Sequence, residues 1–300
     1  MKNKVLVFGL VGESVFMQTN HFHSCGETIT IDNIHKEPGG KGFNQAITLA
    51  RLGIKTTFIG VIGNDYKSVC EDFLNSEQLS YHLVIKNGMS AYATIITDKK
   101  GENEVSVYHG VNKLFSRHDV KKYENEFLDT AYVLIQAELP EEVVDEVIKL
   151  SKKYGVKVII NPAPAKPFIK KYLNDAFLIT PNLQEAKTLF SLDEITIDNL
   201  KEQLSKFSLS RVVITLGSKG VIIKNVNKVT YLSALKIKKV VDTTGAGDVF
   251  NGALITSLMK DNDLIEACKF AVKVSGMSVQ TPYVMPSIPT LKKVEDYTDE

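Results

Sequence analysis

A glycine-rich segment near the C-terminus places an acidic side chain beside backbone that can bind an anion. The segment is Asp242-Thr-Thr-Gly-Ala-Gly-Asp248, and the apolar pattern that follows it predicts a helix from about residue 247. The first N–H groups of a helix lack partners and carry partial positive charge, so they attract phosphate. Asp248 at this site either takes part in chemistry or only caps the helix. The same helix terminus predicts a lowered pKa for Asp248.

A second glycine-rich loop, Pro38-Gly-Gly-Lys-Gly-Phe-Asn44, precedes another amphipathic segment. Its adjacent glycines, Gly39 and Gly40, allow a ligand to approach the backbone closely. The side-chain amide of Asn44 can both donate to and accept from a hydroxyl group. The loop therefore suits a ligand that carries hydroxyls. The alternative is a simple turn into a helix, with Lys41 in solvent.

The order of apolar runs predicts the scaffold that positions these loops. Strands are predicted at 5–9, 133–136, 158–161, 178–180, 211–215 and 220–223, and helices at about 42–53, 140–154, 247–260 and 264–279. Strands that alternate with helices of this length are typical of a mostly parallel sheet covered by helices on both faces. The fold class is therefore α/β.

Two segments with period-two alternation do not fit this scheme. They run from Glu13 to Pro38 and from Ala91 to Val107, the second with a turn at 99–101. Alternation of this kind predicts exposed antiparallel strands. We expect them to form a small separate sheet, a lid made by about residues 12–38 and 90–110. The lid would be inserted in one domain that spans residues 1–300.

Composition and charge exclude several classes of protein. The formal net charge is +1, which provides no electrostatic footprint for nucleic acid or an anionic membrane. Three widely spaced cysteines, Cys25, Cys70 and Cys268, form neither a zinc motif nor a disulfide framework, which favours a reducing, cytoplasmic location. The apolar run from Val5 to Leu10 is too short for a signal-peptide core or a membrane span. The absence of a Walker A loop excludes a P-loop kinase.

Together, the two loops resemble the signature segments of the ribokinase-like (PfkB) carbohydrate kinases, in the same order and with the same wide separation. The resemblance covers nearly the whole chain and includes residues 161–165, 180–185 and 214–220. It implies a three-layer fold with a β-sheet lid and ATP-dependent phosphorylation of a sugar hydroxyl. The first expected reaction is D-ribose to ribose 5-phosphate. The resemblance also implies Mg²⁺, a K⁺-type cation and a homodimer formed through the lid.

The resemblance further implies roles for individual residues. Asp248 corresponds to the catalytic base, and the amides of Gly245, Ala246 and Gly247 to the site of the transferring phosphoryl group. The sugar-binding positions correspond to Gly12, Ser14, Gly39, Gly40, Lys41, Asn44 and Glu138. Asn182, Thr215, Gly217 and Gly220 correspond to the nucleotide site, and Glu185 to a residue that organises Mg²⁺. The monovalent cation positions correspond to Asp242, Thr244, Ser278, Thr281 and Ser287.

The chain departs from the family pattern after the first strand. Members that phosphorylate ribose carry an asparagine and an aspartate there, where this chain has Gly12 and Ser14. A lost partner for a buried sugar hydroxyl costs about 1–3 kcal/mol. Ser14 should therefore select less strongly for paired hydroxyls, and Gly12 should leave room for a bulkier substituent. Alternation along the strand predicts that Glu13 points to the opposite face. Tyr283 stands near a glycine position of the cation loop.

Two kinds of alternative remain open. The same chemistry could act on 2-deoxyribose, a nucleoside or a ketohexose. A different class of protein would be a catalytically silent sugar- or nucleotide-binding regulator. The intact set of Asp248, the glycine loop, Asn182 and Glu185 argues against silence, because a degenerate copy should lose the base or the anion site first.

Overall fold

The computed structural model describes residues 2–99, 102–192 and 196–298, and a nine-stranded sheet forms the centre of these residues. The strand order is β13-β12-β11-β10-β9-β8-β1-β4-β5. The strands are β1 (Lys4–Phe8), β4 (Thr56–Gly63), β5 (Ser80–Lys86), β8 (Thr130–Gln136), β9 (Lys157–Asn161), β10 (Leu178–Ile179), β11 (Arg211–Thr215), β12 (Val221–Asn225) and β13 (Lys228–Leu232). Neighbours from β5 to β11 pair in parallel, whereas β11, β12 and β13 pair antiparallel. The predicted mostly parallel α/β sheet is confirmed.

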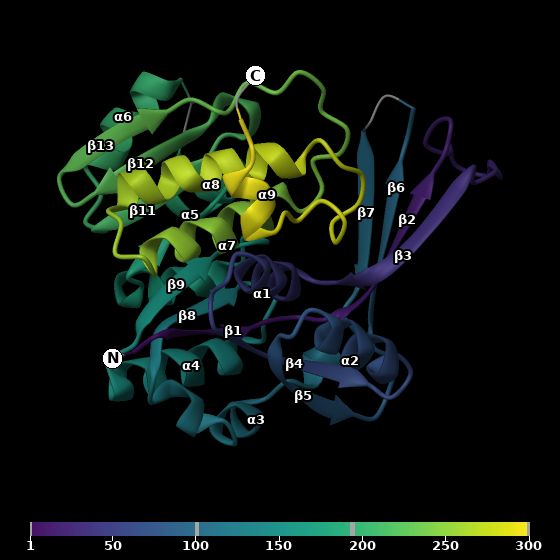
Figure 1. The fold of residues 1–300 in the computed structure, drawn as a ribbon, viewed down its shortest axis with the longest axis horizontal. Coiled ribbons are helices and arrows are strands. Elements are labelled where there is room, and N and C mark those ends of the chain that lie inside the picture. The colour runs from purple at the N-terminus through teal and green to yellow at the C-terminus, as the bar shows by residue number, and fades with distance from the viewer. Residues whose placement is uncertain (1, 100–101, 193–195, 299–300) are drawn as a thin grey trace.

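Helices cover both faces of the sheet and complete a three-layer structure (Figure 1). On one face lie α1 (Lys41–Arg51), α2 (Lys67–Ser76), α7 (Ala246–Leu258), α8 (Leu264–Ser278) and α9 (Leu291–Glu295). On the other lie α3 (Arg117–Lys121), α4 (Glu141–Tyr154), α5 (Leu183–Phe190) and α6 (Ile197–Ser205). Short 3-10 turns occupy Gly110–Leu114, Glu124–Phe127, Pro167–Asp175 and Gly217–Lys219.

Hydrophobic cores on both faces of the sheet explain why the central strands are continuously apolar. In β1, Val5 and Val7 enter the core shared with α1, α7 and α8, while Leu6 and Phe8 enter the core shared with α3 and α4. All four side chains are fully buried. A strand covered on both faces has no position where a polar side chain can reach water, so alternation disappears.

The alternating segments form the predicted separate sheet, which stands apart from the body beside the carboxyl ends of β1 and β5 (Figure 1). Its strand order is β3-β2-β6-β7, made of β2 (Gly12–Gln18), β3 (Asn33–Gly39), β6 (Ala91–Thr97) and β7 (Asn103–Tyr108). We call this four-stranded sheet the lid. The prediction of antiparallel pairing holds for β2 with β3 and β6 with β7, but β2 and β6 are parallel.

The parallel pair arises because the chain leaves the main sheet twice in the same direction. Strand β2 follows β1 after three residues, and β6 follows β5 after four. Two strands that each continue from parallel neighbours keep that common direction. The predicted turn at 99–101 falls largely outside the described residues, since 100 and 101 are not among them.

A loop near the C-terminus ties the lid to the body. The carboxylate of Glu37 in β3 accepts hydrogen bonds from the main-chain N–H groups of Val284 (2.9 Å) and Met285 (3.2 Å). The ring of Tyr283 stacks on His35 with 4.0 Å between ring centroids, and Asn33 donates to the Tyr283 hydroxyl at 2.9 Å. Strand β3 is therefore fixed to residues 283–285 by both main-chain and side-chain contacts.

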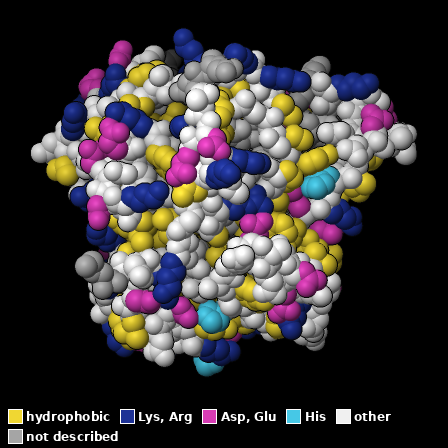
Figure 2. Space-filling view, in the orientation of Figure 1, with side chains coloured by type: hydrophobic (Ala, Val, Ile, Leu, Met, Phe, Trp, Pro, Cys, Tyr) yellow, Lys and Arg dark blue, Asp and Glu magenta, His cyan; other side chains and the backbone are white. Residues whose placement is uncertain are grey.

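The surface carries charges of both signs. On the face shown in Figure 2, Lys and Arg side chains alternate with Asp and Glu and do not gather into one large patch. Across the described residues, no helix combines the length and the apolar character needed to cross a membrane.

Candidate active site

The glycine-rich segment 242–248 forms the turn into α7, and Gly245 is the residue that caps it. Gly245 has a φ of 76°, and a Cβ added there would lie 2.7 Å from Cγ1 of Val284. Only glycine fits this left-handed, crowded position. Asp248 is the third residue of the helix, so the alternative in which it caps the helix is wrong. The N–H of Ala246 donates to the carbonyl of Thr243 at 3.2 Å and is thus already paired.

The carboxylate of Asp248 is buried between α7 and α1. Its Oδ2 accepts from Nδ2 of Asn44 at 2.8 Å, and its Oδ1 accepts from Nε2 of Gln45 at 2.9 Å. Burial raises the pKa of Asp248, while the Lys41 ammonium and the hydrogen bonds from Asn44 and Gln45 oppose this shift. The predicted lowering by the helix terminus is therefore wrong in direction. Removal of water around the carboxylate outweighs the favourable charges and dipoles.

A close helix crossing brings these groups together. A Cβ added to Gly252 would lie 2.5 Å from Cβ of Thr48, so α7 approaches α1 directly over that glycine. Gly252 follows Asp248 by four residues, and Thr48 follows Asn44 by four, which places each pair on one helix face. The glycine at the crossing thus sets the distance at which Asn44 and Gln45 reach Asp248.

Three carboxylates surround the side chain of Lys41, the first residue of α1. Its pKa is raised chiefly by Asp248, and Glu138 and Glu185 add to this, while burial opposes it. Burial raises the pKa of Glu138 to about 7; the Lys41 charge lowers it and the Asp248 charge raises it further. The N–H of Lys41 also donates to Oε2 of Glu138 at 3.3 Å. Lys41 is thus not the solvent-exposed lysine of the alternative interpretation.

Asn182 and Glu185 form a reciprocal cap at the start of α5. Oδ1 of Asn182 accepts from the N–H of Glu185 at 2.8 Å, and Oε2 of Glu185 accepts from the N–H of Asn182 at 2.8 Å. This capping box holds both side chains in place. Burial raises the pKa of Glu185, partly opposed by its bond to the Asn182 N–H and by the Lys41 charge.

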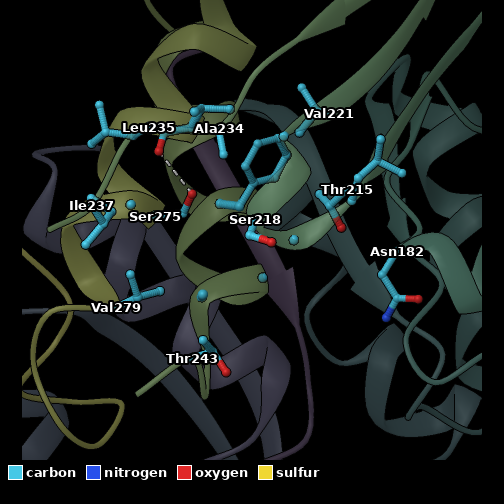
Figure 3. A pocket seen from close by; sticks show the side chains of 18 of the residues that line it. Asn182, Thr215, Ser218, Val221, Ala234, Leu235, Ile237, Thr243, Ser275 and Val279 are labelled. Carbon is cyan, nitrogen blue, oxygen red and sulfur yellow. Dashed lines mark hydrogen bonds between the residues drawn. The ribbon is translucent and has the colours of Figure 1, made fainter. Parts of the chain in front are cut away.

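A cavity of about 770 Å³ extends from α5 to the N-terminus of α7. All four predicted nucleotide residues line it: Asn182, Thr215, Gly217 and Gly220. Figure 3 shows Asn182 and Thr215 on one side of the cavity, with Leu235, Ile237 and Val279 on the other. The apolar wall also includes Val240, Phe250 and Val272, none of which the sequence patterns indicated. Ala246 and Gly247 line the end of the cavity, so the start of α7 opens into it.

Two of the predicted sugar-binding residues lie side by side in the lid. Ser14 in β2 and Gly39 in β3 are close neighbours, because a Cβ added to Gly39 would lie 2.2 Å from Oγ of Ser14. Gly40 has a φ of 125° and caps α1, directly before Lys41. Glu13 lies between Gly12 and Ser14 in the register, and its carboxylate pairs with Lys36 at 3.5 Å, on the face opposite Ser14.

The expectation that Gly12 leaves empty space is wrong. A Cβ added to Gly12 would lie 2.1 Å from the carbonyl oxygen of Ala91 and 2.7 Å from the Ala91 Cβ. The neighbouring strand β6 therefore fills the volume beside Gly12. Gly12 allows β2 and β6 to approach each other, rather than enlarging the ligand site.

The residues predicted to hold a monovalent cation lie in the turn before α7 and in the segment from the end of α8 to Ser287, and Asp242 joins the two. Oδ1 of Asp242 accepts from the N–H of Thr244 at 2.8 Å, and Oδ2 accepts from the N–H of Tyr283 at 2.9 Å. At the end of α8 and in the loop after it, the hydroxyls of Ser278 and Ser287 donate to main-chain carbonyls at 2.8 Å each, and Thr281 is partly buried. Within the described residues, no three His, Cys, Asp or Glu side chains form a cluster that could hold a metal ion.

The sequence patterns missed the polar side chains beneath Asp248. Gln45, Gln136 and Asn161 are buried and hydrogen-bonded to one another. Gln45 is the residue next to Asn44, and Asn161 begins the segment 161–165 that resembles the kinase family. A polar side chain at a helix position otherwise occupied by core residues was the available signal, because such a group must find a partner.

Comparison with known proteins places this geometry in a family. The model of the pfkB family carbohydrate kinases matches residues 2–291. Ribokinase from Staphylococcus aureus is 32% identical, over 98% of this chain and 99% of that protein. Ribokinase from Haemophilus influenzae is 31% identical, over 100% of this chain and 99% of that protein.

A solved structure of a related enzyme has the same fold. The crystal structure of ribokinase from Thermotoga maritima is 30% identical, with a TM-score of 0.84 and coverage of 97% of both chains. The fold, the α7 site and the match over nearly the whole length agree. This chain belongs to the pfkB family of carbohydrate kinases.

Proposed function

We propose that this chain transfers the terminal phosphoryl group of ATP to a hydroxyl of D-ribose and produces ribose 5-phosphate. The observation that carries the proposal is the position of Asp248, buried between the cavity that ends at α7 and the polar side chains of α1. Two full-length relatives at 31–32% identity are named as ribokinases. The structure of ribokinase from Arabidopsis thaliana, in complex with ribose and ATP, is 25% identical with a TM-score of 0.88.

The alternatives have less support. Solved nucleoside kinases of similar fold are only 20–21% identical to this chain. A deoxyribokinase from Salmonella typhi is 26% identical. A silent binding protein would not need to keep a carboxylate buried at an anion site, which costs free energy. Ribose is therefore the acceptor that the sequence and the site support best.

In the proposed reaction, the base and sugar of ATP bind the apolar cavity and the phosphates reach the start of α7. The N–H groups of Gly245 and Gly247 donate to no main-chain carbonyl within the described residues, so they are available to phosphoryl oxygens. The Lys41 ammonium adds a positive charge next to Asp248. Preorganised donors of this kind stabilise the charge that develops on the transferring group.

Asp248 accepts the proton of the attacking hydroxyl. The acceptor oxygen forms a bond to the γ-phosphorus, the bond from that phosphorus to the β-phosphate oxygen breaks, and ADP leaves. Because burial raises the pKa of Asp248, its carboxylate is a stronger base than an exposed aspartate. In a loose transition state the hydroxyl proton leaves late, so a moderate base is sufficient.

The donor sets fit the cations that the family implies. Mg²⁺ is commonly held by one or two carboxylates together with substrate phosphates, and Glu185, whose neighbour Gln184 lines the cavity, offers such a carboxylate. For K⁺, oxygen atoms come from two segments that Asp242 already joins, at Asp242, Thr244, Ser278, Thr281 and Ser287. Mg²⁺ would neutralise charge on the phosphates, and K⁺ would order the turn before α7.

The lid supports a homodimer. Its outer face, opposite Phe16 and Glu37, exposes large apolar side chains: Ile34 is 55% exposed and Tyr108 is 53% exposed. A four-stranded sheet with such a face is a typical protein interface. The cytoplasmic location stays a prediction that rests on cysteine usage.

Substitution of Asp248 by Asn should abolish turnover while nucleotide binding stays nearly intact. The amide keeps the shape of the side chain but cannot accept the proton, and loss of a general base costs about 10² to 10⁴ in rate. ADP release with Mg-ATP and a panel of pentoses, hexoses and nucleosides measures turnover. Retention of more than about a tenth of the wild-type kcat would exclude Asp248 as the base.

Potassium should raise kcat/KM above the value in sodium or choline at equal ionic strength. A cation bound by Asp242 and the neighbouring loop would order the turn at Gly245–Gly247 before phosphate arrives. The Asp242→Asn variant should lose the dependence on potassium, because it removes the charged ligand. Equal rates in all three salts for the wild-type protein would remove the cation site from the proposal.

Light scattering at micromolar concentration should show a particle of twice the 33.3 kDa chain mass. The Ile34→Glu variant should lower this mass towards one chain, since it places a charge on the outer face of the lid. A single-chain mass for the wild-type protein would contradict the dimer and leave the kinase proposal intact.

The preference for ribose over 2-deoxyribose should be less than about tenfold, which corresponds to about 1.4 kcal/mol. Ser14 offers one hydroxyl where a carboxylate would accept from two sugar hydroxyls. The Ser14→Asp variant should shift the kcat/KM ratio towards ribose, and Ser14→Asn is its neutral control. Because Glu37 lies opposite Ser14 in the register, the Tm of each variant must be measured too. A wild-type preference for ribose above about a hundredfold would contradict the role of Ser14.

A further inference from the structure

A chain of buried amide side chains runs beneath the carboxylate of Asp248. Nε2 of Gln136 donates to Oε1 of Gln45 at 2.8 Å. Nε2 of Gln45 donates to Oδ1 of Asp248 at 2.9 Å and to Oδ1 of Asn161 at 3.1 Å. Nδ2 of Asn161 donates to the carbonyl of Thr180 at 2.9 Å. The chain joins β8, α1, β9 and α7 within the core, and Gln45 and Gln136 are fully buried.

A main-chain carbonyl fixes the direction of every donor in this chain. The carbonyl of Thr180 can only accept, so the NH₂ group of Asn161 must face it. Oδ1 of Asn161 then faces Gln45, and that position requires the NH₂ group of Gln45. The two hydrogens of this group point to Asn161 and to Asp248, and Oε1 of Gln45 is left to accept from Gln136.

Asn44 and Gln45 differ in whether their side-chain amides still have an unpaired atom. Both donate to Asp248, but Oδ1 of Asn44 is buried and has no hydrogen-bond partner within the described residues. That oxygen can accept from a hydroxyl of the acceptor. Every polar atom of Gln45 is already paired inside the protein, so Gln45 has no group left for a ligand.

We propose that Gln45 is a positioning residue that holds the catalytic carboxylate of Asp248 through an amide chain anchored on the Thr180 carbonyl. The inference rests on the proposed function, in which Asp248 is the base. Gln45 touches neither acceptor nor nucleotide in this scheme and acts through Asp248. It fixes the rotation of the carboxylate and stabilises its charged form with an uncharged donor.

An uncharged donor suits this position because charged groups already face Asp248 from the other elements. The charge of Lys41 in α1 lowers the pKa of Asp248, and the charge of Asp248 raises the pKa of Lys41. The charge of Asp248 also raises the pKa of Glu138, after β8, and of Glu185 in α5. Gln45 assists the carboxylate without altering the charge balance among those four groups. Its loss should therefore change the base itself, rather than the affinity for ATP.

The Gln45→Met variant tests this role, with Thr48→Val as its matched control. Met keeps the length of the side chain and removes the donor. Thr48 lies one turn further along α1, is equally buried, and donates only to the carbonyl of Asn44 at 2.8 Å. Both variants lose buried hydrogen bonds at the α1–α7 contact, but only Gln45→Met takes one from Asp248.

In Gln45→Met, the acid limb of the pH profile of kcat should move up by about one pH unit, and the plateau kcat should fall about tenfold. The KM for ATP should stay within about twofold, because Gln45 is remote from the cavity. Thr48→Val should leave the acid limb in place. The proposal is overturned if the limb and the kcat of Gln45→Met match those of Thr48→Val.

A second measurement does not require activity and so separates this inference from the proposed function. Burial raises the pKa of Asp248 in the folded protein above its ordinary value, so the folded state loses stability as the pH rises from that ordinary value through the raised pKa. Loss of the Gln45 donor raises this pKa further. The loss of unfolding free energy in Gln45→Met, relative to wild type, should thus grow as the pH rises through the range in which Asp248 ionises in the folded protein, and then level off.

The same loss in Thr48→Val should not change with pH. A deficit in Gln45→Met that is equal at all pH values would show that Gln45 does not act on the carboxylate. If the wild-type protein phosphorylates no sugar but the pH-dependent deficit is found, the acceptor assignment fails and the role of Gln45 stands.

Discussion

The structure depends on one costly arrangement, a carboxylate held almost without water between two helices. An isolated buried charge is strongly unfavourable, so Asp248 requires donors and an opposite charge close by. Asn44, Gln45 and Lys41 supply them, all from the first turn and a half of α1. This supply requires α1 to cross α7 at very short range, which Gly252 permits by its missing side chain. The sheet and the helices packed on it hold α1 and α7 in the positions that this contact requires.

The surroundings differ on the two sides of this contact. On one side, the start of α7 opens into an apolar cavity that extends to α5 and β11. On the other side, Asp248 faces α1 and the segment that connects α1 with the lid. A phosphoryl donor and a hydroxyl acceptor can thus approach one helix N-terminus from opposite sides. The parallel sheet supports this arrangement, because its loops all gather at the carboxyl ends of the strands.

Sequence patterns predicted several strands that are buried on both faces, such as those at 133–136 and 211–215. They predicted no element between residues 54 and 90, where β4, α2 and β5 lie. Strand β4 is buried along its whole length, but threonines and Gly60 interrupt its apolar run, whereas α2 and β5 are only partly buried and their patterns are mixed. The pKa of Asp248 was mispredicted because burial depends on how two distant helices cross. The packing of Ala91 against Gly12 likewise depends on strand order, which a local pattern does not contain.

Tyr283 adopts a φ of 66°, a conformation in which glycine is at ease and a tyrosine is strained. Its ring offsets the strain by stacking on His35 and accepting from Asn33. A glycine at this position would leave the unfolded chain many more backbone conformations than a tyrosine does. The loop that carries Tyr283 and its neighbours therefore loses less conformational entropy when it folds against Asp242, which favours the folded form of the contact between this loop and the turn before α7.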